Sequence, residues 1–177
     1  MDVINAPDPA LRIKTKPVKK ITPGLIQTLN QMIKLTKTFQ DPEGVGLAST
    51  QVGLDESFFI ADGQVNKKGG QKFIKVINPK IIFFGKRTKA YFEGCLSIPG
   101  SWGEVKRHTL VRVSYQDETG KTITKTLKGV LAWIFQHEID HLYGILFPDR
   151  VLQQKGRFYK WTGRDKTGTD MFQEVTI

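Results

Sequence analysis

Apolar residues recur at helical spacing near the start of the chain. Intervals of three and four residues place them on one face of a helix. The preceding Thr22-Pro23 pair is typical of a helix N-terminus, with threonine as the cap and proline in the first turn. The pattern predicts an amphipathic helix over residues 23–38. The apolar positions that create it are Leu25, Leu29, Met32 and Ile33.

Short runs of strand-like composition follow, rich in β-branched and aromatic residues. Residues 41–46 contain glycine and proline and are predicted to form a loop. Two of the runs flank residues 117–120, DETG, which indicates a hairpin turn with glycine. The predicted strands cover residues 57–62, 73–77, 80–84, 110–115 and 121–127.

Residues 129–143 form a second predicted helix, and Gly144 is its expected C-terminal stop. Apolar side chains occupy nearly every face, which indicates a helix buried on all sides. A central buried helix with short, mostly antiparallel strands predicts the α+β class. No clear period follows residue 153, so residues 151–177 receive no assignment. The apolar positions are Val130, Leu131, Trp133, Ile134, Phe135, Ile139 and Leu142.

The composition is that of an ordinary globular protein. The chain has 177 residues, 39% hydrophobic and 25% charged, which excludes collagen-like, coiled-coil and disordered chains. This length predicts one domain over residues 1–177. No apolar run approaches the ~20 residues that span a bilayer, and a single cysteine excludes an internal disulfide framework. We therefore expect a soluble, cytoplasmic protein without a membrane partner.

The charge is strongly basic. Lys and Arg number 27 against 17 Asp and Glu, which gives a net charge of +10. The basic residues concentrate between Asp8 and Asp41, where no acidic residue occurs, and in the tail from Arg150 onward. Such a charge favours polyanions or an anionic surface, and it predicts ribosomal RNA as a partner. The alternative is a solvated basic face that only aids solubility.

The buried helix contains an HExxH pattern formed by His137, Glu138 and His141. Histidines four residues apart share a helix face and can bind one metal ion, with the glutamate beside a bound water. The alternative is a chance match, which is usually found on an exposed helix. Polar groups are costly to bury in an apolar helix unless they are paired, so the apolar flanks favour the metal site.

A catalytic metal usually has a third protein ligand. In the metzincin proteases it is a histidine three residues after a glycine, but here Phe147 stands three residues after Gly144. A thermolysin-like site needs a downstream carboxylate in a helix, and none of those available lies in a predicted helix. Cys95 is the better candidate, since a thiolate near a divalent cation is deprotonated at neutral pH. A buried structural cysteine is the alternative. The downstream carboxylates are Asp149, Asp165, Asp170 and Glu174.

Three segments together resemble the three motifs of the peptide deformylases, in the same order and at similar spacings. They are residues 44–51 (GVGLASTQ), 93–97 (EGCLS) and 136–141 (QHEIDH). The resemblance extends from about residue 4 to residue 150. It implies a metal-dependent hydrolase that removes the formyl group from the N-terminal formyl-methionine of nascent polypeptides and releases formate.

The resemblance also implies the metal chemistry. Cys95, His137 and His141 match the metal ligands, and Glu138 matches the catalytic carboxylate. A divalent metal lowers the pKa of bound water from about 15.7 toward 7, so metal-bound hydroxide is expected to attack the formyl carbon. Glu138 then serves as general base and acid. The implied native metal is Fe²⁺, with Zn²⁺, Ni²⁺ or Co²⁺ able to substitute; the ligand set itself suits iron or zinc.

Further matches surround the metal. Gln51 and the backbone N–H of Leu96 match the groups that polarise the formyl oxygen, and Gly46 matches a residue whose backbone meets the substrate. Gln136 and Asp140 match a supporting shell, in which a carboxylate beside a ligating imidazole fixes its tautomer. Either histidine could be the one that Asp140 serves. The residues matching the methionine pocket are Val45, Val130, Trp133 and Ile134, of which Val130 and Ile134 are alternatively ordinary core residues.

Several positions depart from the family pattern or extend it. Ser49 replaces a usual alanine and should fit. Trp102 stands where many bacterial members have an arginine near the substrate mouth, which predicts a stacking or apolar surface there. Arg107 is expected to pair with Glu93. The tail lacks the C-terminal helix of many bacterial members, so ribosome docking through such a helix is not implied.

Two other function classes compete with this interpretation. The first is a zinc endopeptidase that uses the same helix, against which Phe147 and the cysteine motif argue. The second is a non-enzymatic metal-binding or RNA-binding module, which would need neither Glu138 nor Gln51 beside the ligands.

Overall fold

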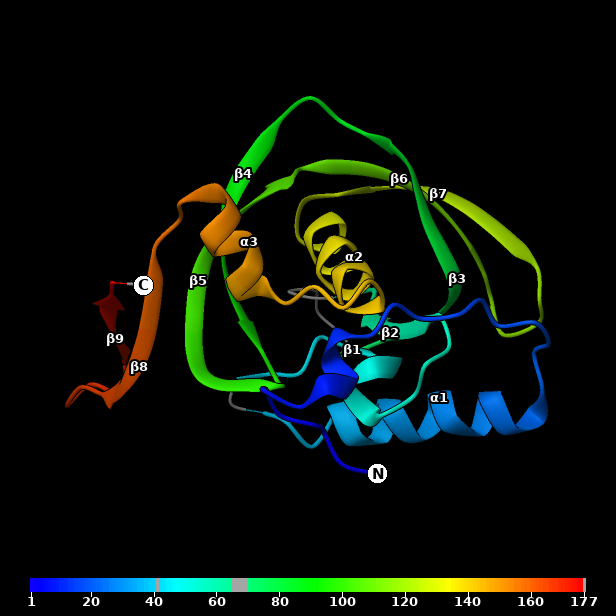
Figure 1. Ribbon diagram of the computed structural model, residues 1–177, viewed down its shortest axis with the longest axis horizontal. Coiled ribbons are helices and arrows are strands. Elements are labelled where there is room, and N and C mark those ends of the chain that lie inside the picture. Colours follow the sequence, from blue (N-terminus) through cyan, green and yellow to red (C-terminus); the bar gives the residue numbers. More distant parts are fainter. Residues whose placement is uncertain (41, 65–69, 177) are drawn as a thin grey trace.

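Two antiparallel sheets surround a central helix (Figure 1). The computed structural model describes residues 1–40, 42–64 and 70–176, and these contain nine strands. The five-stranded sheet has the order β1-β2-β3-β6-β7, and the four-stranded sheet has the order β4-β5-β8-β9. The predicted α+β class is confirmed. The strands are β1 (Gly46–Ala48), β2 (Phe58–Asp62), β3 (Phe73–Phe84), β4 (Thr88–Cys95), β5 (Ile98–His108), β6 (Leu110–Gln116), β7 (Thr122–Lys128), β8 (Phe158–Arg164) and β9 (Asp170–Val175).

Helix α2 (Gly129–Leu142) lies in the middle of the fold, framed by the strands (Figure 1). Its apolar face packs on the five-stranded sheet, where the rings of Phe59 and Phe135 meet edge to face at 5.1 Å. Gly144 ends the helix with φ +70°, and a Cβ there would lie 2.4 Å from the carbonyl oxygen of Arg12. Only glycine tolerates both conditions. The predicted buried helix and its stop are therefore both present.

Helix α1 (Pro23–Thr36) begins as predicted. The Thr22 hydroxyl accepts a hydrogen bond from the Leu25 N–H at 3.2 Å, which satisfies a donor of the first turn. Its buried face packs on Leu47 and Phe58 beneath the five-stranded sheet. The helix ends two residues before the predicted boundary, because the Thr38 and Phe39 N–H groups bond to carbonyls three residues back and tighten the chain into a turn.

All five predicted strands are present, with one difference. The runs predicted at 73–77 and 80–84 belong to one strand, β3, whose register shifts at Asn78 and Pro79. Asn78 has φ +51°, which the sequence pattern did not predict. Its side chain makes hydrogen bonds to the backbone N–H and carbonyl of Val18. The predicted turn at 117–120 joins β6 to β7. Asp41, the first residue of the predicted loop 41–46, lies outside the described residues.

Several elements have no counterpart in the predictions. Strands β4 and β5 are long but largely polar or exposed, so their period is weak. Helix α3 (Phe147–Gln154) is too short to show a period, and it corrects the expectation that Asp149 lies outside any helix. Two 3₁₀ turns, η1 (Pro9–Arg12) and η2 (Ser49–Val52), also appear. The tail forms the β8–β9 hairpin, and the described part of the chain after α3 contains no helix.

Within residues 1–40, 42–64 and 70–176, no helix is both long and apolar enough to cross a bilayer.

Candidate metal centre and active site

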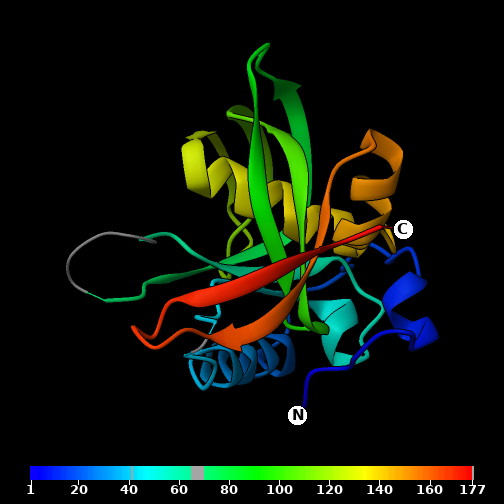
Figure 2. The same cartoon turned by 90° about the vertical axis from the view of Figure 1, so that its left-hand side faces the viewer.

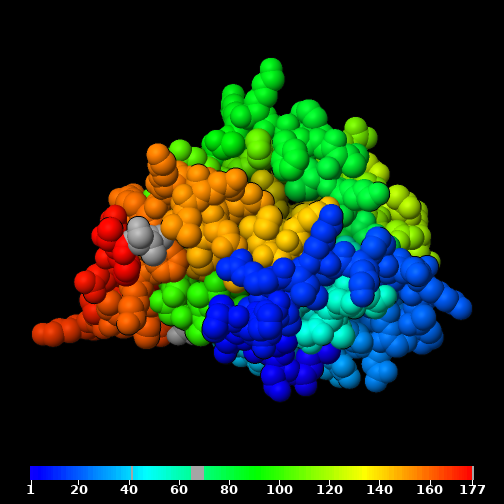
Figure 3. All heavy atoms as spheres, viewed as in Figure 1, coloured from blue at the N-terminus to red at the C-terminus, as the bar shows by residue number. Residues whose placement is uncertain are grey.

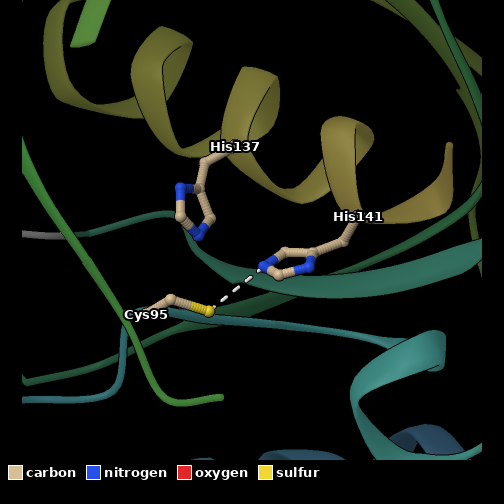
Figure 4. Close-up of side chains that lie close together, drawn as sticks. All are labelled: Cys95, His137 and His141. Atoms are coloured by element: carbon tan, nitrogen blue, oxygen red, sulfur yellow. Dashed lines mark hydrogen bonds between the residues drawn. The ribbon is translucent and has the colours of Figure 1, made fainter. Parts of the chain in front are cut away.

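The three predicted metal ligands converge from two elements. His137 and His141 stand one turn apart on α2, and Cys95 is the last residue of β4. Their ligand atoms lie within 4.8 Å of one another, and the Cys95 sulfur is 3.3 Å from Nε2 of His141 (Figure 4). One thiolate and two imidazoles at these separations match the donor set and spacing of a tetrahedral metal site with one open position.

A buried carboxylate orients His137. Glu93 is fully buried, and its Oε2 lies 2.9 Å from Nδ1 of His137, which leaves Nε2 facing the other ligands. Oε1 of Glu93 accepts a hydrogen bond from the Trp133 indole N–H at 2.8 Å. Burial alone would favour the neutral acid, but hydrogen bonds from Arg107 and His137 lower the pKa of Glu93 to about 2. The carboxylate therefore fixes the tautomer and the ring orientation of one ligand.

The predicted pair of Glu93 and Arg107 is present. Nε and Nη2 of Arg107 donate to the two carboxylate oxygens at 2.7 and 2.9 Å, a bidentate arrangement. Nη1 of the same guanidinium donates to Asp140 at 2.5 Å. One buried arginine thus links Glu93, behind His137, to Asp140 on α2.

Asp140 supports the site indirectly, through Arg107. Among the described residues, the side-chain partners of its carboxylate are two arginines and neither histidine: its oxygens accept hydrogen bonds from Arg107 and from Arg150, whose Nη2 lies at 2.5 Å. The expectation that it holds a histidine is therefore wrong, and Glu93 has that role.

Gln136, the other residue predicted to support the site, fastens α2 to the end of β5. Its Nε2 donates to the carbonyl of His108 at 2.8 Å, and its Oε1 accepts from the His108 N–H at 3.1 Å. This pair of bonds fixes the helix, and with it the histidines that follow Gln136, against the four-stranded sheet.

Glu138 lies buried beside the ligands. It is 4% exposed, and burial raises its pKa to about 7. A Cβ on Gly46 would lie 2.3 Å from its Oε1, so only glycine leaves room for the carboxylate. The resemblance implied that the backbone of Gly46 meets the substrate. The close approach of Glu138 is a second reason why this position needs glycine.

Two buried polar atoms at the site have no partner within the described part of the chain. They are Oε2 of Glu138 and Nδ1 of His141. Buried polar atoms are rarely left unpaired unless a water, ion or ligand completes them. A free glutamate oxygen beside a Cys-His-His cluster fits a centre that holds a metal ion and a reacting water.

Gln51 and Leu96 adjoin the cluster as predicted. Gln51 is held on η2, where its Oε1 accepts from the Ala48 N–H at 2.8 Å. Its Nε2 donates to the Ser97 hydroxyl at 3.1 Å and lies 3.4 Å from the Cys95 sulfur. The amide N–H groups therefore face the ligands, and Leu96 follows Cys95 in the same wall. Ser49, the replacement for alanine, is buried and donates to the Glu56 carbonyl.

A pocket of about 170 Å³ opens beside these groups. Four of the five residues predicted to bind substrate line it, together with Trp102 and the catalytic candidates. The fifth, Val130, lies outside this lining and packs against the core under the helix. Trp102 stacks on Phe92, with ring centroids 5.3 Å apart and planes at 8°, so an aromatic ring stands at this edge of the pocket. The four predicted residues are Val45, Gly46, Trp133 and Ile134.

Comparisons with known proteins agree with these motifs. The family model for polypeptide deformylase matches residues 1–157. A peptide deformylase of Halothermothrix orenii is 43% identical over 148 residues, 82% of this chain and 90% of its own. The crystal structure of the Thermotoga maritima peptide deformylase has a TM-score of 0.75 and 37% identity, and the match covers 84% of this chain and 95% of that one. That of Synechococcus elongatus, in complex with actinonin, has a TM-score of 0.77 and 37% identity over 85% of this chain and 78% of its own. The chain therefore belongs to the peptide deformylase family, the metal-dependent hydrolases that remove the formyl group from nascent polypeptides.

Proposed function

We propose that the protein hydrolyses the formyl amide of N-formyl-methionine peptides at the centre formed by Cys95, His137 and His141. The observation that carries this proposal is the buried Glu138, whose free oxygen lies beside the three ligand atoms in a pocket shared with Gln51. A site that only bound metal would not need a buried, unpaired carboxylate. Such a group is costly to keep unless it moves a proton.

The chain's own residues divide the work. Glu138 takes a proton from the attacking water and returns it to the departing amine of methionine. Its raised pKa suits both steps near neutral pH. Nε2 of Gln51 and the N–H of Leu96 donate to the formyl oxygen as negative charge develops there. Losing one such donor costs about 100–1,000-fold in rate.

The ligands would hold one divalent ion. A metal bound there supplies a Lewis acid and lowers the pKa of water to near neutrality. We propose Fe²⁺ as the native ion, with Zn²⁺, Ni²⁺ or Co²⁺ able to substitute, because one thiolate and two imidazoles suit these ions. Metal analysis of protein purified without oxygen tests this assignment.

The methionine side chain would occupy the apolar part of the pocket. Val45, Trp133 and Ile134 line it, and the Gly46 backbone runs along one wall. Val130 would act from behind the lining, through the core that supports Ile134. This arrangement favours an unbranched apolar side chain beside the metal.

An endopeptidase has less support. Phe147, at the position of a metzincin third ligand, is 1% exposed and packs between Val105 and Val151. Asp149, a candidate for a thermolysin-like ligand, accepts a hydrogen bond from the Leu146 N–H and pairs with Arg12. Neither side chain is available to the histidines.

We further propose that the protein works in the cytoplasm as one domain, with ribosomal RNA rather than a membrane as its docking surface. The net charge of +10 supports a polyanion partner. If the association is electrostatic, binding to ribosomes weakens steeply between 50 and 200 mM salt, by roughly 10-fold or more for several phosphate contacts. Binding unchanged over that range would contradict it.

The decisive experiment measures formate release from formyl-Met-Ala by anaerobically purified protein of known metal content. Cys95→Ser is expected to lose both metal and activity. Glu138→Gln is expected to keep the metal and to lose about 100-fold or more in kcat. Glu118→Gln, which makes the same change on a distant turn, is the matched control. Full activity in Glu138→Gln, or no formate from metal-loaded protein, would contradict the proposal.

A further inference from the structure

A second cavity, of about 350 Å³, adjoins the metal-site pocket. The two share the wall formed by residues 94–96 together with Pro42 and Trp102. On the far side, the second cavity is lined by Trp161, Asp170 and Phe172 of the C-terminal hairpin. A peptide whose first residue lies at the metal can therefore continue past Trp102 into a space walled by β8 and β9.

The hairpin is built into the sheet that carries the cysteine ligand. Strand β8 pairs with β5 so that Tyr159 lies opposite Trp102, and Trp102 in turn lies opposite Gly94 on β4. Figure 2 shows the orange and red hairpin in front of the green strands, and Figure 3 shows the same segment forming one end of the molecule. The family match ends at residue 157, just before β8, so the hairpin belongs to this chain beyond the matched part.

One face of the hairpin is aromatic and points to the cavity. The Phe172 ring meets Trp102 edge-on at 5.7 Å and Phe92 at 4.9 Å. The Trp161 indole donates to Asp170 at 2.9 Å, which holds its ring at the cavity wall. Met171 alternates to the other side of β9 and lies outside the lining. Trp161 is 42% exposed, so its ring has area left to cover.

We propose that this cavity binds the two residues that follow formyl-methionine, and that the hairpin makes large apolar or aromatic side chains preferred there. The inference rests on the proposed function and names a substrate preference at the same site. Aromatic rings fixed at their edges supply large contact areas at low entropic cost, and they stack on other rings. An apolar wall of this kind favours substrates whose side chains bury more apolar area against it.

The test compares kcat/KM for formyl-Met-Phe-Phe and formyl-Met-Ala-Ala, two substrates of equal length. The full chain is expected to prefer the first by roughly tenfold, a usual span for an apolar subsite. Trp161→Ala should remove most of that preference, by lowering kcat/KM for formyl-Met-Phe-Phe. Trp161→Phe should keep the preference, and Met171→Ala, on the opposite face of the hairpin, should match the unaltered chain.

The outcomes separate this inference from the proposed function. Formate release from both substrates without a preference, or a preference that survives Trp161→Ala, would overturn the subsite alone. An equal loss of preference in Met171→Ala would also overturn it, because the effect would then come from the fold of the hairpin. No formate from either substrate would overturn the proposed function, and the subsite with it.

Discussion

Helix α2 is held by opposite means on its two sides. Toward the five-stranded sheet it presents Phe135 and Ala132 to a closed apolar cluster. Toward the four-stranded sheet its side chains meet charged groups, with His137 on Glu93 and Asp140 on Arg107. The first side makes contacts without preferred direction, and the second makes hydrogen bonds of defined geometry.

The difference teaches what each side contributes. Apolar burial is the larger source of stability and tolerates small shifts. A buried ion-pair network gains little net free energy, because desolvation offsets its attraction. The hydrogen bonds of Glu93 and Arg107 do, however, hold the His137 ring in one orientation. The apolar side therefore keeps the helix in place, and the charged side aims its ligands.

The largest effect on stability is expected from Arg107→Met. This change leaves Glu93 and Asp140 buried without their shared partner, which should cost about 3–5 kcal/mol of unfolding free energy. Metal content should fall as well, because Glu93 loses the group that holds it against His137. Chemical denaturation and metal analysis measure the two effects.

Arg157→Met is the matched control for that change. Arg157 pairs with Glu104 at the surface, with 60% of its side chain exposed. Its loss should leave the free energy of unfolding nearly unchanged, because solvent screens an exposed ion pair. Equal losses of unfolding free energy in Arg107→Met and Arg157→Met would mean that a buried ion pair and an exposed one contribute alike.

Leu127→Ala tests the apolar side. Leu127 is 2% exposed in the cluster under α2, and its truncation should cost about 2–5 kcal/mol. Metal content and kcat of the folded protein should stay unchanged, in contrast to Arg107→Met. Leu152→Ala, at a 58% exposed position, should change neither stability nor activity. A loss of metal in folded Leu127→Ala protein would remove the proposed division between the two sides.

Gly46→Ala should reduce activity with little loss of stability. Its Cβ would lie 2.3 Å from Oε1 of Glu138, so the carboxylate must move. Displacement of a reacting group by about 1 Å costs about 100-fold in rate. Gly24→Ala is the control, because its Cβ would approach only the Thr22 hydroxyl at 3.7 Å. Steady-state formate release decides the outcome, and equal rates in both variants would contradict it.

The smallest effect is expected from Asp149→Asn, at a partly exposed ion pair. Burial raises the pKa of Asp149, but hydrogen bonds from Arg12 and the Leu146 N–H outweigh it and lower the pKa below 3.8. A lowered pKa stabilises the fold above about pH 4, the unfolded value. That contribution disappears as pH falls through the folded value. The variant should be less stable by about 0.5–1 kcal/mol at pH 7.

Denaturation at several pH values measures this last difference. The difference in unfolding free energy between Asp149→Asn and the unaltered chain should be constant above about pH 5. It should shrink as the pH falls below about 4. A difference that grows in acid would mean that the pKa of Asp149 is raised in the folded protein, not lowered. A gap as large as that of Arg107→Met would contradict the distinction between exposed and buried pairs.

Much of the centre could be predicted from local pattern. An i, i+4 pair of histidines in an apolar helix specifies its own geometry, because helix spacing places both imidazoles on one face. The same holds for α1, with its cap at Thr22, and for the turn at 117–120. Gln51 and Leu96 were placed by motif, and Cys95 first by the need for a third ligand, and the fold brings all three to the histidines.

Other features depended on pairings between distant residues. Asp140 lies nearer to the histidines in sequence, yet Glu93, 44 residues from His137, makes the contact. Strands β4, β5, β8 and β9 carry no strong period, since their faces are half exposed and their stability comes from cross-strand neighbours.

By itself the sequence determined the helix with its ligands, the α+β class and the family, because these rest on short-range spacing and on motifs. Only the tertiary structure decided which carboxylate orients His137 and that a C-terminal hairpin walls a second cavity beside Trp102. Both follow from the register in which strands far apart in the chain pair, and that register is set by the assembled sheet.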